Sequence, residues 1–221
     1  VLAPQIKSAL TDDNMAIMAK TDGGRALLNR LLAMAIAAGD SDAIERAAKQ
    51  VHDQNMSLSQ GALAALNHCD HPARAIALQA FHDRWQDSPL VMEKWFMMES
   101  MSLVSGTVAR LGELMAHPAF DANNPNKLRS VLGAFMTGNP VHFYAEDGSG
   151  FDFIGDCLID IDARNPQLAA RMALPLTRRT QYAPARRAKM GAVLQKLQQQ
   201  AQSNDLREVI DKALADGPSP V

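Results

Sequence analysis

Short segments with apolar residues at helical spacing recur along the chain, and they constrain its fold more than any other feature. Residues 25–38 are an example, because their larger apolar side chains fall on one stripe of a helix. No segment of comparable length alternates β-branched and polar residues, as a strand would. The abundance of Ala, Leu, Met and Gln favours helix in the same way. The sequence therefore predicts an all-α protein.

Prolines and capping residues divide this helical pattern. Pro89, Pro125 and Pro166 each follow a Ser or Asn and suit the first turn of a helix, where the missing N–H breaks no bond. Residues 146–150 form a loop, and the tail at 216–220 is expected to fray. The predicted helices are 25–38, 41–52, 57–67, 72–86, 89–100, 103–116, 124–136, one ending near 163, one opening at 165–166, 184–201 and 203–215.

The helix starts are roughly 15–25 residues apart, which suits antiparallel helix pairs. Their irregular spacing supports no named repeat family. We predict a right-handed superhelix of antiparallel helix pairs, an α-α solenoid of the HEAT or armadillo kind. No linker interrupts residues 1–221, so a single domain is expected.

The charge balance and the number of cysteines limit which binding partners and which cell compartment are expected. The 22 Lys and Arg against 24 Asp and Glu give a net charge of −2, which provides no global attraction to nucleic acid or an anionic membrane. Two cysteines fit a reducing compartment, and we expect a cytoplasmic protein. No stretch is long and apolar enough to span a membrane, and no signal peptide is evident. The missing initiator Met indicates a piece of a longer protein.

Motifs for several kinds of chemistry are missing from the sequence. It has no His-Glu-x-x-His, no phosphate-binding glycine loop, no Cys-x-x-Cys and no Gly-x-Ser-x-Gly. The run His68-Cys69-Asp70-His71 has residue types that suit zinc, but four consecutive ligands do not close a tetrahedron. The favoured interpretation is a turn between helices with Asp70 as a cap. We therefore expect no metal site and no cofactor in this chain.

Two other segments have two possible interpretations each. Residues 91–101 are rich in Met, Trp and Phe at helical spacing, which suits a buried packing face better than a ligand groove. A basic run in residues 178–189 is compatible with an anion site, although a solvated helix face is the default for such a run. Its members are Arg178, Arg179, Arg186, Arg187 and Lys189.

Five sequence words in order resemble a known family. They are LVMEKWF at 90–96, NPNKLRSVLGAF at 124–135, NPVHFYAEDGSGFDFI at 139–154, RNPQLAARM at 164–172 and PLTRRTQYAPARRAKM at 175–190. This succession resembles the C-terminal domain of bacterial aminopeptidase N, a zinc metallo-aminopeptidase of the alanyl aminopeptidase family. Residues 1–84 are compatible with that family but less distinctive.

The resemblance implies a non-catalytic helical domain of a four-domain enzyme. The one zinc ion belongs to a catalytic domain that this chain does not contain. The helical domain would cap that catalytic domain, wall the internal cavity, control the access of short peptides and contribute a few polar side chains to it.

Family positions that contact substrate map onto Gln167, Arg171 and Arg129. Gln167 and Arg171 are four residues apart and therefore share a helix face, near an N-terminus that favours anions. By sequence alone such a pair more often marks a solvated face. Arg129 is equally compatible with a salt bridge inside the domain.

Two function hypotheses follow. The first is the non-catalytic domain of an aminopeptidase, with the catalytic domain of the same polypeptide and short peptides as partners, and with neither nucleic acid nor membrane. The alternative is an independent helical-repeat scaffold that binds proteins on its concave face.

Overall fold

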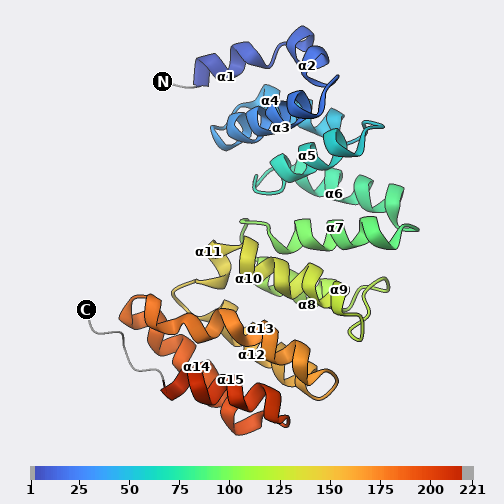
Figure 1. Cartoon of the computed structure of the whole chain (residues 1–221). Coiled ribbons are helices and arrows are strands. Elements are labelled where there is room, and N and C mark those ends of the chain that lie inside the picture. The colour runs from blue at the N-terminus through green and yellow to red at the C-terminus, as the bar shows by residue number, and fades with distance from the viewer. Residues whose placement is uncertain (1–2, 216–221) are drawn as a thin grey trace. The chain divides into compact units, whose positions relative to one another are not determined.

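The structure is a computed structural model that describes residues 3–215 (Figure 1). Within these residues the chain forms helices and turns, with no β-strand. This confirms the predicted all-α class. In the described part of the chain, no helix combines the length and apolarity needed to cross a membrane. The tail predicted to fray lies outside the described residues.

The chain divides into two compact units, residues 1–105 and 106–221. The prediction of a single domain stays a prediction, and the two units are described separately. The first contains α1 (Ala3–Ala9), α2 (Asp12–Met18), α3 (Asp22–Ala37), α4 (Ser41–Gln50), α5 (Met56–Leu66), α6 (Pro72–Trp85) and α7 (Pro89–Ser100).

In the first unit each helix packs on its neighbours in sequence. Helix α5 packs against α3, α4 and α6, and α7 packs against α6. Apolar side chains fill the space between them, with Leu32, Leu63, Leu66 and Phe96 fully buried. A stack of helices that contact only nearby helices is the arrangement expected of an α-α solenoid.

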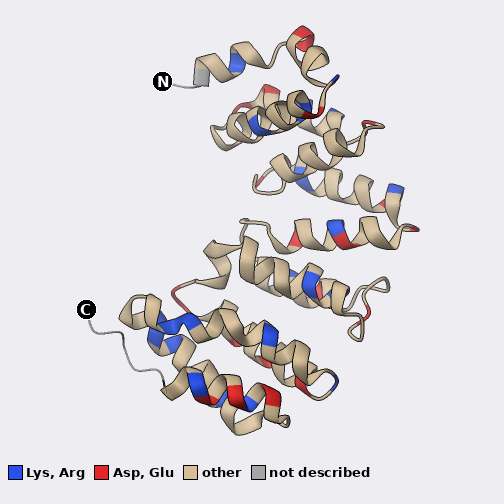
Figure 2. Cartoon of the chain, viewed as in Figure 1, with Lys and Arg blue, Asp and Glu red and all other residues tan. Residues whose placement is uncertain are grey.

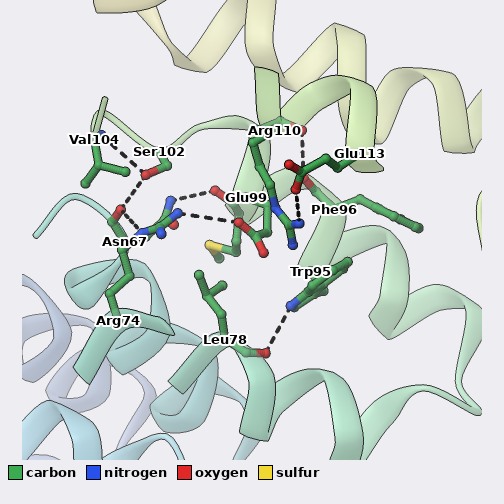
Figure 3. Close-up of polar contacts among 12 residues, drawn as sticks. Asn67, Arg74, Leu78, Trp95, Phe96, Glu99, Ser102, Val104, Arg110 and Glu113 are labelled. Atoms are coloured by element: carbon green, nitrogen blue, oxygen red, sulfur yellow. Dashed lines mark hydrogen bonds and ion pairs between the residues drawn. The ribbon is translucent and has the colours of Figure 1, made fainter. Parts of the chain in front are cut away.

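A polar network ties α5, α6 and α7 together (Figure 3). The Nε of Arg74 donates to the carbonyl of Asn67 at 3.0 Å, and its Nη2 lies 3.4 Å from Oε2 of the buried Glu99. The hydroxyl of Ser102 donates to the same Asn67 carbonyl at 2.8 Å. These contacts satisfy backbone and side-chain groups that the packing of the helices removes from water.

The second unit contains a longer series of helices. They are α8 (Thr107–Met115), α9 (Pro125–Leu128), a π-helical turn (Arg129–Gly133), α10 (Ala134–Gly138), α11 (Pro140–Phe143), α12 (Ser149–Asp162), α13 (Pro166–Thr177), a 3₁₀ turn (Arg178–Gln181), α14 (Pro184–Gln200) and α15 (Asn204–Ala215). Helices α12, α13, α14 and α15 pack on one another, with Met190, Leu194, Leu197 and Ile210 in the core between them.

Most predicted boundaries lie within a few residues of the observed ones, because the capping residues act as expected. Asn55, Asn124 and Asn165 each accept hydrogen bonds from first-turn N–H groups. Helix α8 begins at Thr107 and not at the predicted 103, because Gly106 has φ of 83°, outside the helical region. The short helices α1 and α2 were not predicted.

Candidate functional site

The three residues singled out for substrate contact line one small pocket in the second unit. The pocket has a volume of about 130 Å³ and lies where the first turns of α9 and α13 approach each other. Its lining consists of Pro125, Arg129, Asn165, Gln167, Leu168 and Arg171. The fold thus brings together side chains from two segments far apart in sequence.

The start of α13 presents two of these side chains. Asn165 caps the helix, since its Oδ1 accepts from the N–H of Leu168 at 3.1 Å, and Pro166 occupies the first turn. Gln167 and Arg171 follow one turn apart, and both are exposed. Leu168, on the inward face, is buried and anchors the turn. The local structure predicted for this segment is confirmed.

The third side chain comes from a π-helical turn. Asn124 caps α9 through the N–H of Asn126, at 2.9 Å, and α9 gives way after one turn to a π-helix that begins at Arg129. The sequence predicts an uninterrupted α-helix here, and that register is wrong after Leu128. A π-turn adds one residue to the repeat and changes the direction of the side chains that follow. Such turns occur frequently at functional sites.

The pocket offers hydrogen-bond donors and positive charge. Within residues 3–215, the side chains of Gln167 and Arg171 form no hydrogen bond or ion pair. Arg129 donates to Oδ1 of Asn126 at 3.3 Å and forms no ion pair with the described residues, so the role of Arg129 stays a prediction. No carboxylate lines the pocket. Two guanidiniums and an amide are therefore available to an anionic or carbonyl group.

The volume of this pocket is below the ~300–1,000 Å³ of ordinary small-molecule sites. A space of about 130 Å³ suits one terminal group and not a whole peptide. The pocket can therefore serve as one wall of a larger site.

The zinc-like run at 68–71 forms a turn. His71 is the N-cap of α6, and its Nδ1 accepts from the N–H of Ala73 at 3.2 Å. The prediction that Asp70 is the cap is wrong by one residue. Throughout the described residues, no three His, Cys, Asp or Glu side chains lie close enough to hold a metal ion.

The Met- and Trp-rich segment is a packing face. Met92, Trp95 and Phe96 of α7 are each at most 4% exposed. The indole N–H of Trp95 donates to the carbonyl of Leu78 at 3.1 Å, which satisfies its one buried polar group. Of the two interpretations of this segment, the buried face is confirmed.

A larger hollow was not foreseen from the sequence. It has a volume of about 690 Å³, lies in the first unit among α2, α3, α4 and α5, and carries both acidic and basic side chains. Asp12 and Arg46 form an ion pair on its wall. Its lining comes from four helices, so no local sequence pattern would reveal it.

Comparison with known proteins identifies the family. Residues 3–215 match the DUF3458_C family, described as a domain of unknown function with ARM repeats. The chain belongs to this family. The chain is 40% identical to aminopeptidase N of Escherichia coli (strain K12) over 169 residues, which are 76% of this chain and 19% of that protein. It is 37% identical to aminopeptidase N of Haemophilus influenzae, over 75% of this chain and 19% of that protein.

A solved structure agrees with these relatives. The crystal structure of Legionella pneumophila aminopeptidase A in complex with aspartic acid superposes with a TM-score of 0.87 at 25% identity. The match covers 96% of this chain and 27% of that one. This ARM-repeat chain is thus similar to one part of proteins named aminopeptidase, and it spans about a fifth of the length of the curated relatives it matches.

Proposed function

We propose that this chain is the non-catalytic part of a zinc-dependent aminopeptidase that removes N-terminal residues from short peptides. The relatives named aminopeptidase N support this proposal, since the chain corresponds to only 19% of their length. The zinc ion and the hydrolytic step belong to the remaining, catalytic part of such a polypeptide. Here the domain caps that part, walls its internal cavity and controls the access of peptides. The two free cysteines, Cys69 and Cys157, fit a cytoplasmic location.

The observation that carries the proposal is the convergence of Arg129, Gln167 and Arg171 on one pocket. We propose that this pocket binds the far, C-terminal side of a peptide whose N-terminus lies in the catalytic part. Guanidinium groups suit a terminal carboxylate or a peptide carbonyl, and no carboxylate of the lining opposes such a group. The small volume fits a wall of a shared cavity better than a self-sufficient site.

The test uses the full-length enzyme and alanyl substrates of increasing length. Arg171→Ala is expected to lower kcat/KM for longer peptides about tenfold, because a charge-assisted hydrogen bond contributes ~1.5–3 kcal/mol. A single-residue chromogenic amide, which does not reach the pocket, should be hydrolysed at nearly the parental rate. Arg164→Ala is the matched control, because Arg164 is exposed just before the N-cap of α13 and does not line the pocket. Equal losses on long and short substrates would refute this role.

The non-catalytic assignment has its own test. The purified 221-residue chain with added zinc should not hydrolyse alanyl chromogenic amides. Zinc-dependent turnover that copurifies with the chain and disappears on chelation would overturn the assignment.

A further inference from the structure

Basic residues are segregated in one segment of the second unit. Residues 163–204 contain eight Lys or Arg and no Asp or Glu, in a chain whose net charge is −2. The eight are Arg164, Arg171, Arg178, Arg179, Arg186, Arg187, Lys189 and Lys196. Figure 2 shows blue gathering where α13 gives way to α14. Like charges placed this close repel one another unless something neutralises them.

Two of these arginines form hydrogen bonds with the backbone of a stacked pair of tyrosines. The rings of Tyr144 and Tyr182 lie 4.8 Å apart at 26°. The Nε of Arg186 donates to the carbonyl of Tyr144 at 2.8 Å, and Nη2 of Arg187 lies 3.3 Å from the carbonyl of Tyr182. Burial and a hydrogen bond with Tyr182 raise the pKa of the Tyr144 phenol to about 12, and the charge of Arg178 opposes that rise. Arg178 begins the 3₁₀ turn that ends at Gln181, directly before Tyr182.

Much of the donor capacity at this point is unused. Arg178 is exposed, and its side chain forms no hydrogen bond or ion pair within residues 3–215. Arg186 uses only its Nε among the described residues, which leaves both of its Nη groups available. The Nε of Arg187 is buried and has no hydrogen-bond partner among residues 3–215. A buried N–H with no acceptor costs ~1–3 kcal/mol, so an acceptor supplied from outside would stabilise the group.

The backbone adds to this donor surface. Helix α14 begins at Pro184 after Ala183, which has no side chain to cap it, and the first turn holds no acidic residue. Arg186 and Arg187 instead occupy that turn, where the helix dipole disfavours positive charge. In the loop after Tyr144, the side chain of Asp147 accepts from the N–H and the hydroxyl of Ser149, and the Asp147 carbonyl accepts from Nζ of Lys189 at 2.9 Å.

We propose that Arg178, Arg186 and Arg187, gathered around Tyr144 and Tyr182 at the start of α14, form a binding site for an oxyanion of the carboxylate or phosphate class. Guanidinium forks match two oxygens of either group. Phenol hydroxyls and uncapped backbone N–H groups supply further donors. This site contains none of the residues of the Arg129–Gln167–Arg171 pocket, and the inference does not depend on the proposed peptidase role.

The test is an NMR titration of the 221-residue chain with inorganic phosphate, with ionic strength held constant by sodium chloride. The Nε–Hε signals of Arg186 and Arg187 should shift and saturate, together with the backbone amides of residues 185 and 186. A parallel titration with succinate, a dicarboxylate, shows whether the site binds carboxylate, phosphate or both. Saturation by both anions supports a general oxyanion site, and saturation by one alone assigns the site to that class. Identical responses to phosphate and to chloride would overturn the proposal.

Two variants separate a loss of anion binding from a loss of folding. Arg178→Gln removes an exposed guanidinium that forms no hydrogen bond or ion pair within residues 3–215, so the fold should be retained, and the anion affinity should fall about tenfold. Arg164→Gln removes an equal charge from the opposite end of α13 and should change the affinity less than twofold. Equal weakening by the two variants would mean that the response is a general charge effect, and the site would be rejected.

Discussion

Asp162, at the end of α12, accepts hydrogen bonds from Ser203, just before the start of α15. Its Oδ2 accepts from the backbone N–H groups of Gln202 and Ser203 at 2.7 and 3.0 Å, and its Oδ1 accepts from the Ser203 hydroxyl. The Ser203 Oγ in turn accepts from the N–H of Leu206 at 3.1 Å. Asp162 is 2% exposed. One buried carboxylate thus joins the end of one helix to the cap of another.

Asp162→Ala should therefore destabilise the second unit. Removal of the carboxylate leaves two backbone N–H groups and a hydroxyl without their acceptor, and we expect the free energy of unfolding to fall by about 3 kcal/mol. Urea denaturation followed by circular dichroism measures the change. Asp160→Ala, two residues away on an exposed position, should change stability by less than ~0.5 kcal/mol. A similar loss in both variants would contradict the assigned role.

Gly150 lies against the backbone of Phe143. A Cβ at position 150 would stand 2.7 Å from the carbonyl oxygen and 2.8 Å from the Cα of Phe143. Because backbone cannot move aside as a flexible side chain can, Gly150→Ala should cost about 2 kcal/mol of stability. In Gly191→Ala, within α14, the added Cβ has no atom within 4 Å, so this substitution should stabilise the chain by ~1 kcal/mol. Thermal unfolding of the two variants should therefore shift in opposite directions.

The raised pKa of the Cys157 thiol should make the stability of the protein depend on pH. Burial, and then the charges of Asp160 and Asp156, raise its pKa to about 12 from an ordinary value of 9.0. The folded state then keeps a proton that the unfolded state loses, so stability should fall as pH rises from about 9 toward 12. Cys157→Ala should reduce this slope in urea unfolding measured at increasing pH. The raised pKa of Tyr144 should leave a residual slope. An unchanged slope would contradict the assignment to Cys157.

Loss of the Arg74–Glu99 ion pair should strongly lower the stability of the first unit. Both side chains are largely buried, so Arg74→Ala removes a positive charge beside a desolvated carboxylate and should cost about 3 kcal/mol. Arg74→Lys keeps the charge but loses the geometry that reaches Glu99 and the Asn67 carbonyl together, and should cost less. Lys20→Ala, at an exposed position, is the control. If denaturant unfolding shows equal stability for all three variants, the pair is not structural.

Local chemistry explains which helices could be predicted. Pro89, Pro125 and Pro166 lie in the first turns of their helices, as the sequence indicates. Helix α2 escaped prediction because none of its residues is buried, so it has no apolar stripe. Its cap was nevertheless visible, since Thr11 accepts from the N–H of Asn14. The capping residue would have located this helix, whereas the spacing of apolar residues did not.

The candidate site depends on tertiary contacts that sequence patterns do not express. The shared face of Gln167 and Arg171 follows from their spacing, but Arg129 reaches the same pocket only because the first turns of α9 and α13 meet. The π-turn beginning at Arg129 has no marker in the sequence, because Arg, Ser, Val and Leu are all ordinary helix residues. Family resemblance singled out Arg129, and the fold shows its position.

The charged side chains of the Arg129–Gln167–Arg171 pocket share one further property. The guanidinium groups of Arg129 and Arg171 can donate hydrogen bonds but cannot accept them. This wall therefore attracts a carboxylate or carbonyl oxygen and repels an ammonium group. If a peptide meets this pocket, its charged N-terminus is turned away from it.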